Sequence, residues 1–336
     1  MGINIFDIAK EANVSIATVS KVVNNTGRIS DKTRRRVLEI IEKYNYTPNL
    51  LATALTGKNS YTLGLLMPNL ANPFFGEIAK SVEDRARELG FSVIMCSTDY
   101  DAEREALYFT LLQKKRVDGV IILSGFENQD IIASRKLKPD MPVALIARDV
   151  QTFPINSISI DDFVGGYEAA RHLLQLGHRR MGLIVENIKC AWERVRGFRQ
   201  ALAEEGLTLE DRYIVTGEAT VENGKAFALR LLDEDPAPTA IFATNDILAI
   251  GTLRAAGERR LQVPEKLSVV GFDNTLLATI ADPPLTTVAQ PMAQMGSQIV
   301  DLLVQEIKGE ATNKQRIVLL PELVVRESTA APTNGQ

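Results

Sequence analysis

Residues 7–24 read DIAKEANVSIATVSKVVN, a stretch with the spacing of two short helices joined by a tight turn. Asn4 can cap the first helix and Ser15 the second, because short polar side chains accept hydrogen bonds from the free N–H groups of a first turn. Apolar residues recur at helical spacing in both halves. The stretch therefore predicts a helix-turn-helix unit.

The residues that follow are expected to complete a small helical domain. Residues 24–27 form a breaker cluster, and Ser30 is placed to cap a third helix that ends before Pro48. The residues expected on the inner face of this helix are Val37, Leu38, Ile40 and Ile41. We therefore expect a three-helix headpiece at residues 1–47.

Charge is distributed unevenly along the 336 residues. The whole chain has a formal net charge of −4, but residues 1–60 hold nine Lys and Arg against five acids, which gives them +4 and leaves −8 on the remainder. A small basic end on an acidic body is the asymmetry expected when one end binds a polyanion. The headpiece is the part expected to bind it.

From Tyr61 onward, short apolar runs alternate with longer amphipathic stretches. The runs typical of buried strands are residues 62–67, 92–96, 119–123, 143–146, 157–160, 181–185, 240–243 and 267–271. The stretches expected as helices are residues 76–89, 103–114, 162–176, 191–205 and 223–232. Such alternation predicts parallel sheets with helices on both faces, and there is too much of it for one small sheet. We expect an α/β core of two doubly wound parallel-sheet lobes with a ligand cleft between them.

Composition excludes several classes of protein. A chain with 45% hydrophobic, 24% charged and 6% aromatic residues is typical of a folded globular protein and unlike collagen, a disordered chain or a coiled-coil rod. No apolar run reaches the roughly 20 residues of a membrane helix, and the first residues lack a signal-peptide pattern, so we expect a cytoplasmic protein without a membrane partner. Two cysteines, Cys96 and Cys190, and two histidines, His172 and His178, are too few for a disulfide framework or a metal cage. No metal or other cofactor is expected.

The sequence also lacks the common signatures of enzymes. It contains no GxGxxG, GxxxxGK[ST], HExxH or GxSxG motif. Residues 217–225 resemble a phosphate loop only superficially, because the glycines are too far apart and Ala226 follows the lysine where a Ser or Thr would hold magnesium. We expect a binding protein and not an enzyme.

Residues 7–24 are similar to the DNA-binding headpiece of the LacI/GalR repressor family, whose pattern D-[IV]-A-x-x-A-x-V-S-x-x-T-V-S-[RK]-V-[LV]-N they match throughout. The resemblance implies that the second helix enters the major groove of double-stranded operator DNA. The hydroxyls of Ser15 and Ser20 are suited to phosphate oxygens, and Ala17 and Lys21 are expected to face base edges. The DNA-binding residues expected in the headpiece are Ser15, Ile16, Ala17, Thr18, Ser20, Lys21 and Asn24.

Residues 48–57, PNLLATALTG, resemble the family's hinge helix, which forms where two chains meet over the minor groove. By this resemblance Leu55 wedges between base steps and kinks the duplex. A plain interdomain linker is the alternative. Two departures from the family pattern reduce the expected contacts: Lys21, where Arg is more frequent, lacks a bidentate fork, and Thr53, also usually Arg, removes a charge.

Short motifs in the core resemble the family's effector-binding segments. Residues 69–75, NLANPFF, correspond to a loop that places an aromatic ring over the ligand, and Arg194 corresponds to an arginine that binds the effector. The TND and GFD motifs at 244–246 and 271–273 follow strands and supply amide and carboxylate groups suited to hydroxyls. The expected effector-binding residues are Phe74, Phe75, Asp161, Trp192, Arg194, Asn245, Asp246 and Asp273. Core packing is the alternative for the three aromatic residues among them, and a helix cap or a surface acid is the alternative for the polar ones.

The resemblance also implies a domain layout. After the headpiece we expect a hinge helix and linker at residues 48–60 and a core at residues 61–329 whose lobes resemble those of periplasmic binding proteins. The first lobe is expected at residues 61–160 and 291–318, and the second at residues 161–290 and 319–329. The small, polar residues 330–336 are expected to be a disordered tail.

The resemblance covers residues 3–328 and implies a sequence-specific transcription regulator, in first place a repressor of carbohydrate-related genes. A homodimer would bind a pseudopalindromic operator, and a sugar or sugar derivative between the lobes would change its affinity for DNA, in a direction that is left open. The absence of C-terminal leucine heptads favours a dimer over a tetramer. The alternatives are a solute-binding receptor, which would lack the basic headpiece, and a sugar-metabolising enzyme, which would need a catalytic base or a phosphate loop.

Overall fold

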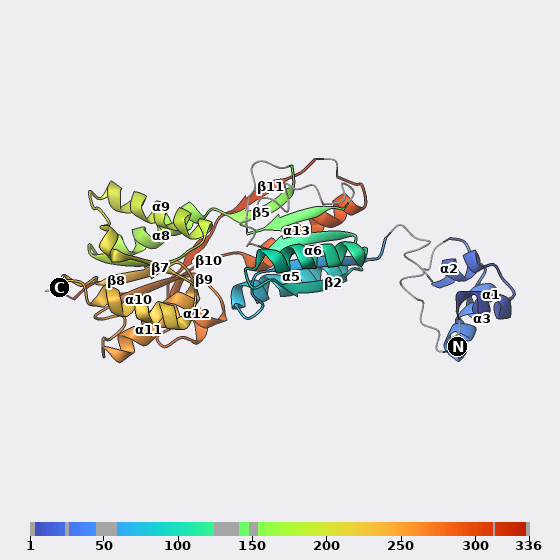
Figure 1. Cartoon of the computed structure of the whole chain (residues 1–336), viewed down its shortest axis with the longest axis horizontal. Helices are drawn as coiled ribbons and strands as arrows, with labels where there is room; N and C mark the ends of the chain where they lie inside the picture. The colour runs from blue at the N-terminus through green and yellow to red at the C-terminus, as the bar shows by residue number, and fades with distance from the viewer. Residues whose placement is uncertain are drawn as a thin grey trace. The chain divides into compact units, whose positions relative to one another are not determined.

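The computed structural model describes residues 4–23, 27–44, 59–123, 141–147, 154–311 and 313–333. The chain separates into two units, Met1–Tyr61 and Thr62–Gln336 (Figure 1). None of the helices within the described ranges is long and apolar enough to cross a membrane.

Three helices make up the first unit: α1 (Ile5–Ala12), α2 (Ile16–Val23) and α3 (Asp31–Lys43). Asn4 Oδ1 accepts hydrogen bonds from two backbone N–H groups of α1. Ser15 Oγ accepts one from the Thr18 N–H at 3.1 Å, and Ser30 Oγ accepts one from the Thr33 N–H at 3.3 Å. The expected caps are therefore present, and the predicted helix-turn-helix unit is confirmed.

The core of this unit consists of small and branched apolar side chains. Its buried members are Ile8, Ala9, Ala12, Val19, Val22, Val37 and Ile40. The prediction that Leu38 faces inward is wrong, since its side chain is 47% exposed. The helical period of α3 directs Val37 and Ile40 to the core and leaves Leu38 about a quarter-turn outside that stripe.

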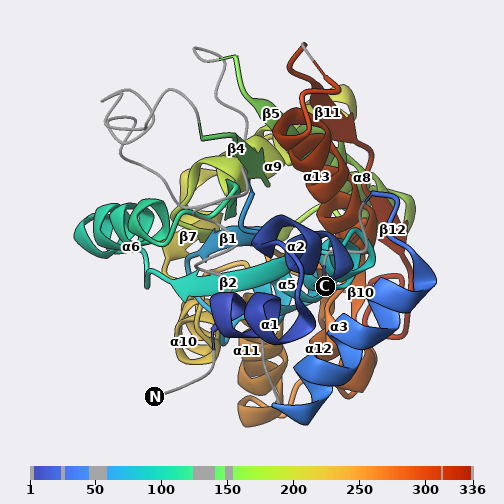
Figure 2. The ribbon, with the colours of Figure 1, turned by 90° about the vertical axis from the view of Figure 1, so that its right-hand side faces the viewer.

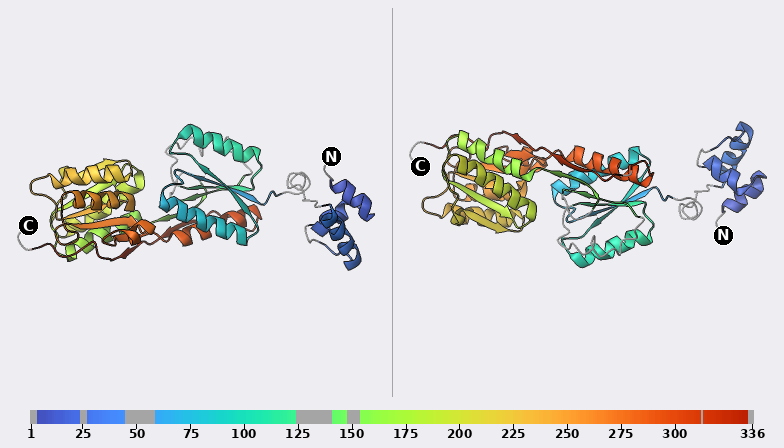
Figure 3. Two further views of the ribbon diagram at one scale, coloured as in Figure 1. Left: turned by 90° about the horizontal axis from the view of Figure 1, so that it is seen from below. Right: turned by 90° about the horizontal axis from the view of Figure 1, so that it is seen from above.

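The first lobe of the second unit contains a parallel six-stranded sheet in the order β11-β5-β4-β3-β1-β2. Its strands are β1 (Thr62–Met67), β2 (Ser92–Ser97), β3 (Gly119–Leu123), β4 (Val143–Ile146), β5 (Asn156–Ile160) and β11 (Arg316–Leu319). Strands β1 and β2 run side by side in Figure 2. On one face lie α5 (Pro73–Glu88) and α13 (Met292–Ile307), and on the other lies α6 (Ala102–Lys114) (Figure 3).

The second lobe contains another six-stranded sheet, in the order β12-β10-β9-β8-β6-β7. Its strands are β6 (Met181–Glu186), β7 (Ile214–Gly217), β8 (Ala240–Ala243), β9 (Ser268–Asp273), β10 (Thr286–Ala289) and β12 (Glu322–Val324). Five of these strands are parallel, and β12 pairs with β10 in the antiparallel sense at one edge. Its helices are α8 (Asp162–Gln175), α9 (Lys189–Glu204), α10 (Val221–Leu232), α11 (Asp246–Glu258) and α12 (Leu276–Ile280), with a 3-10 turn at Asp211–Tyr213.

The chain passes between the two lobes three times. The crossings lie between β5 and α8 at Asp161, between β10 and α13 at residues 290–291, and between β11 and β12 at residues 320–321. Each lobe is therefore built from segments far apart in the sequence. A rotation of one lobe against the other would have to be absorbed by these short connections.

Helices α8 and α9 approach closely because each has a glycine at the contact. A Cβ added at Gly166 would lie 1.8 Å from the backbone oxygen of Arg194, and one added at Gly197 would lie 1.9 Å from that of Phe163. No side chain fits at either position, since such distances are far below van der Waals contact. The two glycines thus set the helix spacing that brings Asp162 to Arg194.

The end of the chain is attached to the second lobe at Ala330 and again at Thr333, whose Oγ1 accepts from Lys266 Nζ at 3.5 Å. The carbonyl oxygen of Ala330 accepts hydrogen bonds at 2.9 Å from His178 Nε2 and 3.0 Å from Ser268 Oγ. The expectation of a disordered tail from residue 330 is therefore wrong at Ala330. Its composition is that of a tail, but His178 and Ser268 are buried polar groups that need partners, and the chain end satisfies them. Residues 334–336 lie outside the described ranges.

Gly166→Ala should lower the free energy of unfolding by at least about 1–3 kcal/mol, because the added methyl group must push α8 and α9 apart. Gly257→Ala is the matched control: Gly257 is an exposed residue of α11, and an added Cβ there meets open space. That variant should be neutral or stabilised by up to about 1 kcal/mol. Chemical denaturation measures both values, and equal midpoints for the two variants would contradict the close packing.

Candidate functional site

A cavity with about 490 Å³ of empty space, part of it open to solvent, lies between the two lobes of the second unit, where the carboxyl ends of their parallel strands meet. The first lobe lines it with Asn72, Phe74, Phe75, Ala147 and Ile160. The second lobe and the connection between lobes line it with Asp162, Glu186, Ile188, Cys190, Arg194, Asn245, Asp273 and Gln290. This is the position at which open α/β sheets bind ligands.

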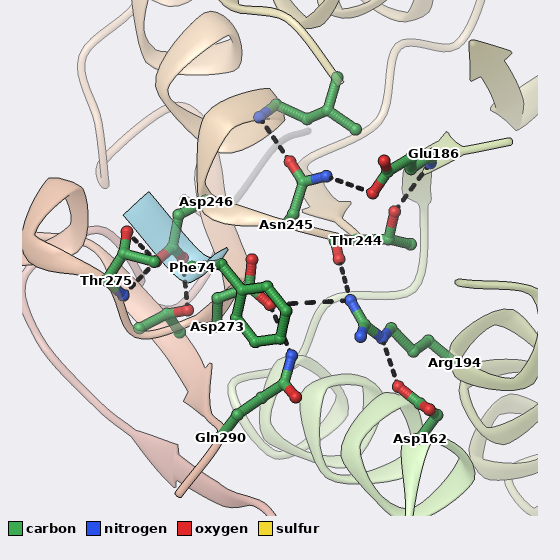
Figure 4. Close-up of polar contacts among 12 residues, drawn as sticks. Phe74, Asp162, Glu186, Arg194, Thr244, Asn245, Asp246, Asp273, Thr275 and Gln290 are labelled. Carbon is green, nitrogen blue, oxygen red and sulfur yellow. Dashed lines mark hydrogen bonds and ion pairs between the residues drawn. The ribbon is translucent and has the colours of Figure 1, made fainter. Parts of the chain in front are cut away.

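Arg194 of α9 is the central polar group of the cavity and is only 5% exposed. Its Nε donates to Asp162 Oδ1 at 2.7 Å, and its Nη1 donates to the carbonyl oxygen of Thr244 (Figure 4). Nη1 lies 3.9 Å from Asp273 Oδ1, and the guanidinium carbon lies 3.6 Å from the centre of the Phe272 ring. Burial opposes the charge, yet the neighbouring carboxylates hold the pKa of Arg194 above its ordinary value.

Three carboxyl groups, of which Asp273 is buried and Asp162 and Glu186 are half-buried, line the cavity with this guanidinium. Burial raises the pKa of Asp162, Glu186 and Asp273, and Arg194 offsets only part of the effect at each. Asp273 Oδ1 also accepts a hydrogen bond from Gln290 Nε2 at 2.7 Å. The cavity therefore holds more negative than positive groups among the residues that line it.

Asn245 and Glu186 form a second polar pair at the neighbouring strand ends. Asn245 caps α11 by accepting from the Leu248 N–H at 2.9 Å, and its Nδ2 donates to Glu186 Oε2 at 2.9 Å (Figure 4). The backbone N–H of Glu186 donates to Thr244 Oγ1 at 2.9 Å. Both side chains are held in place by bonds to elements that do not depend on a ligand.

The first lobe contributes an apolar wall. Asn72 Oδ1 accepts from the Phe74 N–H at 3.0 Å, and Pro73 follows at the first helical position, so α5 begins at the cavity with Phe74 and Phe75 in its first turn. The two rings are edge to face, 5.2 Å apart. Both rings are largely buried, and both belong to the lining of the cavity.

Two of the residues that line the cavity have strained backbone conformations. Asp273 and Ala147, both lining residues, have φ angles of 111° and 58°, in the region that glycine favours. Non-glycine residues in such conformations cost of order 1–3 kcal/mol and persist where the surroundings hold them, often at ligand sites.

Five of the eight expected effector residues line the cavity: Phe74, Phe75, Arg194, Asn245 and Asp273. Asp161 instead caps α8, accepting from the Val164 N–H at 3.0 Å. Asp246 is fully buried and accepts hydrogen bonds from Thr275 and Thr287, so it supports the site from behind (Figure 4). Burial raises its pKa to about 6. Trp192 is 42% exposed and is not among the lining residues.

Besides Asn72, which caps α5, three polar lining residues were not expected from the sequence: Asp162, Glu186 and Gln290. Each directly follows or ends a strand, or lies one residue beyond such a position, so a systematic survey of strand ends would have found them. Within the described ranges, no group of His, Cys, Asp and Glu side chains is arranged to hold a metal ion.

The headpiece presents a second surface with binding potential. Of the expected DNA-binding residues, Ser15, Ile16, Ala17 and Lys21 are exposed, whereas Thr18 and Ser20 are half-buried. Ser15 Oγ and Thr18 Oγ1 lie 2.9 Å apart at the start of α2. Asn24 and Leu55 fall outside the described residues.

Comparison with known proteins identifies both units. Residues 4–49 match the family described as bacterial regulatory proteins, lacI family, and residues 170–329 match the periplasmic binding protein-like domain. The chain is 48% identical to the HTH-type transcriptional regulator DegA of Bacillus subtilis (strain 168) over 334 residues, which cover 98% of this chain and 99% of that protein.

Solved structures show the same fold. A lac repressor dimer bound to operator and the anti-inducer ONPF is 31% identical with a TM-score of 0.88, over 98% of this chain and 100% of that one. A complex of the transcriptional regulator CelR with cellobiose is 29% identical with a TM-score of 0.74, over 97% and 99% of the two chains. The expected fold of a helix-turn-helix headpiece and two α/β lobes is confirmed.

Arg194→Met should lower the free energy of unfolding by about 3–5 kcal/mol, because it leaves buried carboxylates without their counter-ion. Arg196→Met is the matched control, since Arg196 lies on the same helix with its side chain 66% exposed and paired to Glu193. The control should change stability by no more than about 1 kcal/mol. Urea denaturation at neutral pH compares them, and a loss at Arg194 no larger than that at Arg196 would refute the role of the guanidinium.

Proposed function

Since the chain belongs to the LacI family of DNA-binding transcriptional regulators, we propose that it is a repressor of carbohydrate-related genes whose affinity for operator DNA is set by a sugar or sugar derivative bound between the core lobes. The observation that carries this proposal is the cavity around Arg194, in which carboxylate, amide and guanidinium groups converge beside two aromatic rings. Such groups bind vicinal hydroxyls through paired hydrogen bonds, and aromatic rings cover the apolar face of a sugar. The CelR complex with cellobiose supports a sugar ligand by analogy.

The DNA-binding part of the proposal rests on the headpiece. Exposed Ala17 and Lys21 on α2 would face base edges in the major groove, and the hydroxyls of Ser15, Thr18 and Ser20 would bind phosphates. Asn24 would extend this contact, and Leu55 would act as the minor-groove wedge. The lac repressor dimer bound to operator supports a homodimer on a pseudopalindromic site, acting in the cytoplasm where the DNA is.

The allosteric part rests on the lobes. A ligand that touches Phe74 on one lobe and Arg194 or Asp273 on the other favours one relative orientation of the lobes over another. Three short crossings provide the hinges. The effector thereby alters operator affinity through the segment that leads to the headpiece.

Lys21→Ala should weaken operator binding by about 1–3 kcal/mol and relax the preference at one base pair in each half-site. Lys32→Ala, at an exposed position of α3, makes the same change in charge. It should at most lower the affinity for all operator variants by the same factor. Gel shifts on a panel of operator variants measure both effects. An unchanged base preference in the Lys21 variant would remove α2 from sequence reading.

Asp273→Asn should reduce ligand affinity about ten- to a hundredfold, because it removes a charged acceptor while keeping the shape of the side chain. Asp211→Asn is the control, since that side chain is 95% exposed on the same lobe. The ligand comes from a thermal-shift screen of sugars, sugar acids and phosphorylated sugars, and calorimetric titration gives the affinities. Operator binding without ligand should survive in both variants, and equal ligand affinities would place the effector elsewhere.

A further inference from the structure

The balance of charge in the cavity bears on the kind of ligand it takes, provided that the proposed effector site is correct. The described lining residues include three carboxyl groups, Asp162, Glu186 and Asp273, and one cation, Arg194. The other described lining side chains are uncharged amides, aromatic rings and aliphatic groups, together with the Cys190 thiol, whose pKa burial raises to about 12. The cavity thus lacks cations for two of its carboxylates.

The guanidinium of Arg194 already has partners within the protein. Arg194 bonds to Asp162 at 2.7 Å and to the carbonyl oxygen of Thr244, and it lies 3.9 Å from Asp273. Asp273 is further held by the Gln290 amide at 2.7 Å. Two of the three carboxyl groups therefore share the one positive charge.

Glu186 is the carboxyl group without a cation. Its carboxyl group accepts a hydrogen bond from the Asn245 amide at 2.9 Å, and among the described residues it forms no ion pair. Its backbone is tied to Thr244 Oγ1 and Asn245 is fixed as the cap of α11, so neither can move away to relieve the charge. A half-buried carboxylate in this position is stabilised either by a proton or by a cation from outside.

An anionic ligand would make this imbalance worse. A phosphate or carboxylate placed in the cavity would add like charge to three carboxyl groups, and Arg194 has little capacity left to neutralise it. A neutral polyol would leave Glu186 without a counter-ion. A protonated amine would form a charge-assisted hydrogen bond with Glu186 and reduce the excess of negative charge.

We infer that the ligand of this cavity is an amine-bearing polyol, such as an amino sugar, whose protonated nitrogen pairs with Glu186 while its hydroxyls bind Arg194, Asn245 and Asp273. The inference deepens the proposed function, because it selects among sugar derivatives by charge. It assigns to Glu186 the role of a specificity-determining residue.

The test measures calorimetric affinities of the full-length protein for matched sugars at a pH at which the amine is protonated. The panel pairs glucosamine with glucose and galactosamine with galactose, and adds N-acetylglucosamine, gluconate and glucose 6-phosphate. In at least one pair the amine should bind about tenfold or more tightly than the alcohol, and the N-acetyl, carboxylate and phosphate compounds should bind more weakly than the amine.

Glu186→Gln should reduce the preference for the amine over the matched neutral sugar to less than about twofold. Glu205→Gln, at the exposed end of helix α9 in the same lobe, makes the same change in net charge and should keep the preference. Because the preference is a ratio within one variant, a loss of stability that affects both sugars equally does not alter it.

The outcomes separate this inference from the function on which it rests. If a neutral or anionic member of the panel binds most tightly and Asp273→Asn abolishes that binding, the effector site stands and the amine assignment is wrong. The same holds if the preference for the amine persists in the Glu186→Gln variant. If no member of the panel binds the cavity, both the amine assignment and the sugar-derived effector are contradicted.

Discussion

A guanidinium buried at the carboxyl edge of the second sheet constrains everything around the cavity. Removing an arginine from water is costly, so its N–H groups and its charge must be matched by partners held in place. Arg194 meets Asp162 from α8, the carbonyl oxygen of Thr244 after β8, Asp273 at the end of β9 and the ring of Phe272 beneath it. Three elements, α8, β8 and β9, are thereby fixed relative to α9. The hydrogen bond between Arg194 and Asp162 requires α8 and α9 to lie close together, and Gly166 and Gly197 permit this approach.

The same constraint gives the cavity its chemistry. Parallel strands deliver polar residues to one edge, and burial then raises the pKa of each carboxyl group there. One guanidinium satisfies two of them and leaves Glu186 with an amide partner only. Hydrogen bonds within the protein preorganise the site, so ligand binding does not have to order these side chains.

Much of this architecture could be predicted from the sequence, because buried strands and helices leave regular patterns of apolar residues along the chain. Strands such as Thr62–Met67 and Gly119–Leu123 begin and end where the apolar runs do. Side-chain direction at the ends of elements was harder to predict. The sequence predicted Asp161 as an effector residue, whereas the structure places Asp162 in the cavity. Adjacent residues at a helix start point in different directions, so Asp161 caps α8 and Asp162 reaches Arg194. Sequence also could not tell that Asp246 is enclosed by Thr275 and Thr287, since those contacts join residues far apart in the chain.

We propose that ligand binding in the cavity and operator binding by the headpiece are coupled, and thermodynamic linkage provides the most direct test. The measurement is the affinity of the cavity ligand for the full-length protein, titrated calorimetrically once alone and once in complex with operator duplex. We expect operator DNA to change the ligand affinity by at least about fivefold, and the ligand to change the operator affinity by the same factor. Equal ligand affinities for the free and the DNA-bound protein would contradict it.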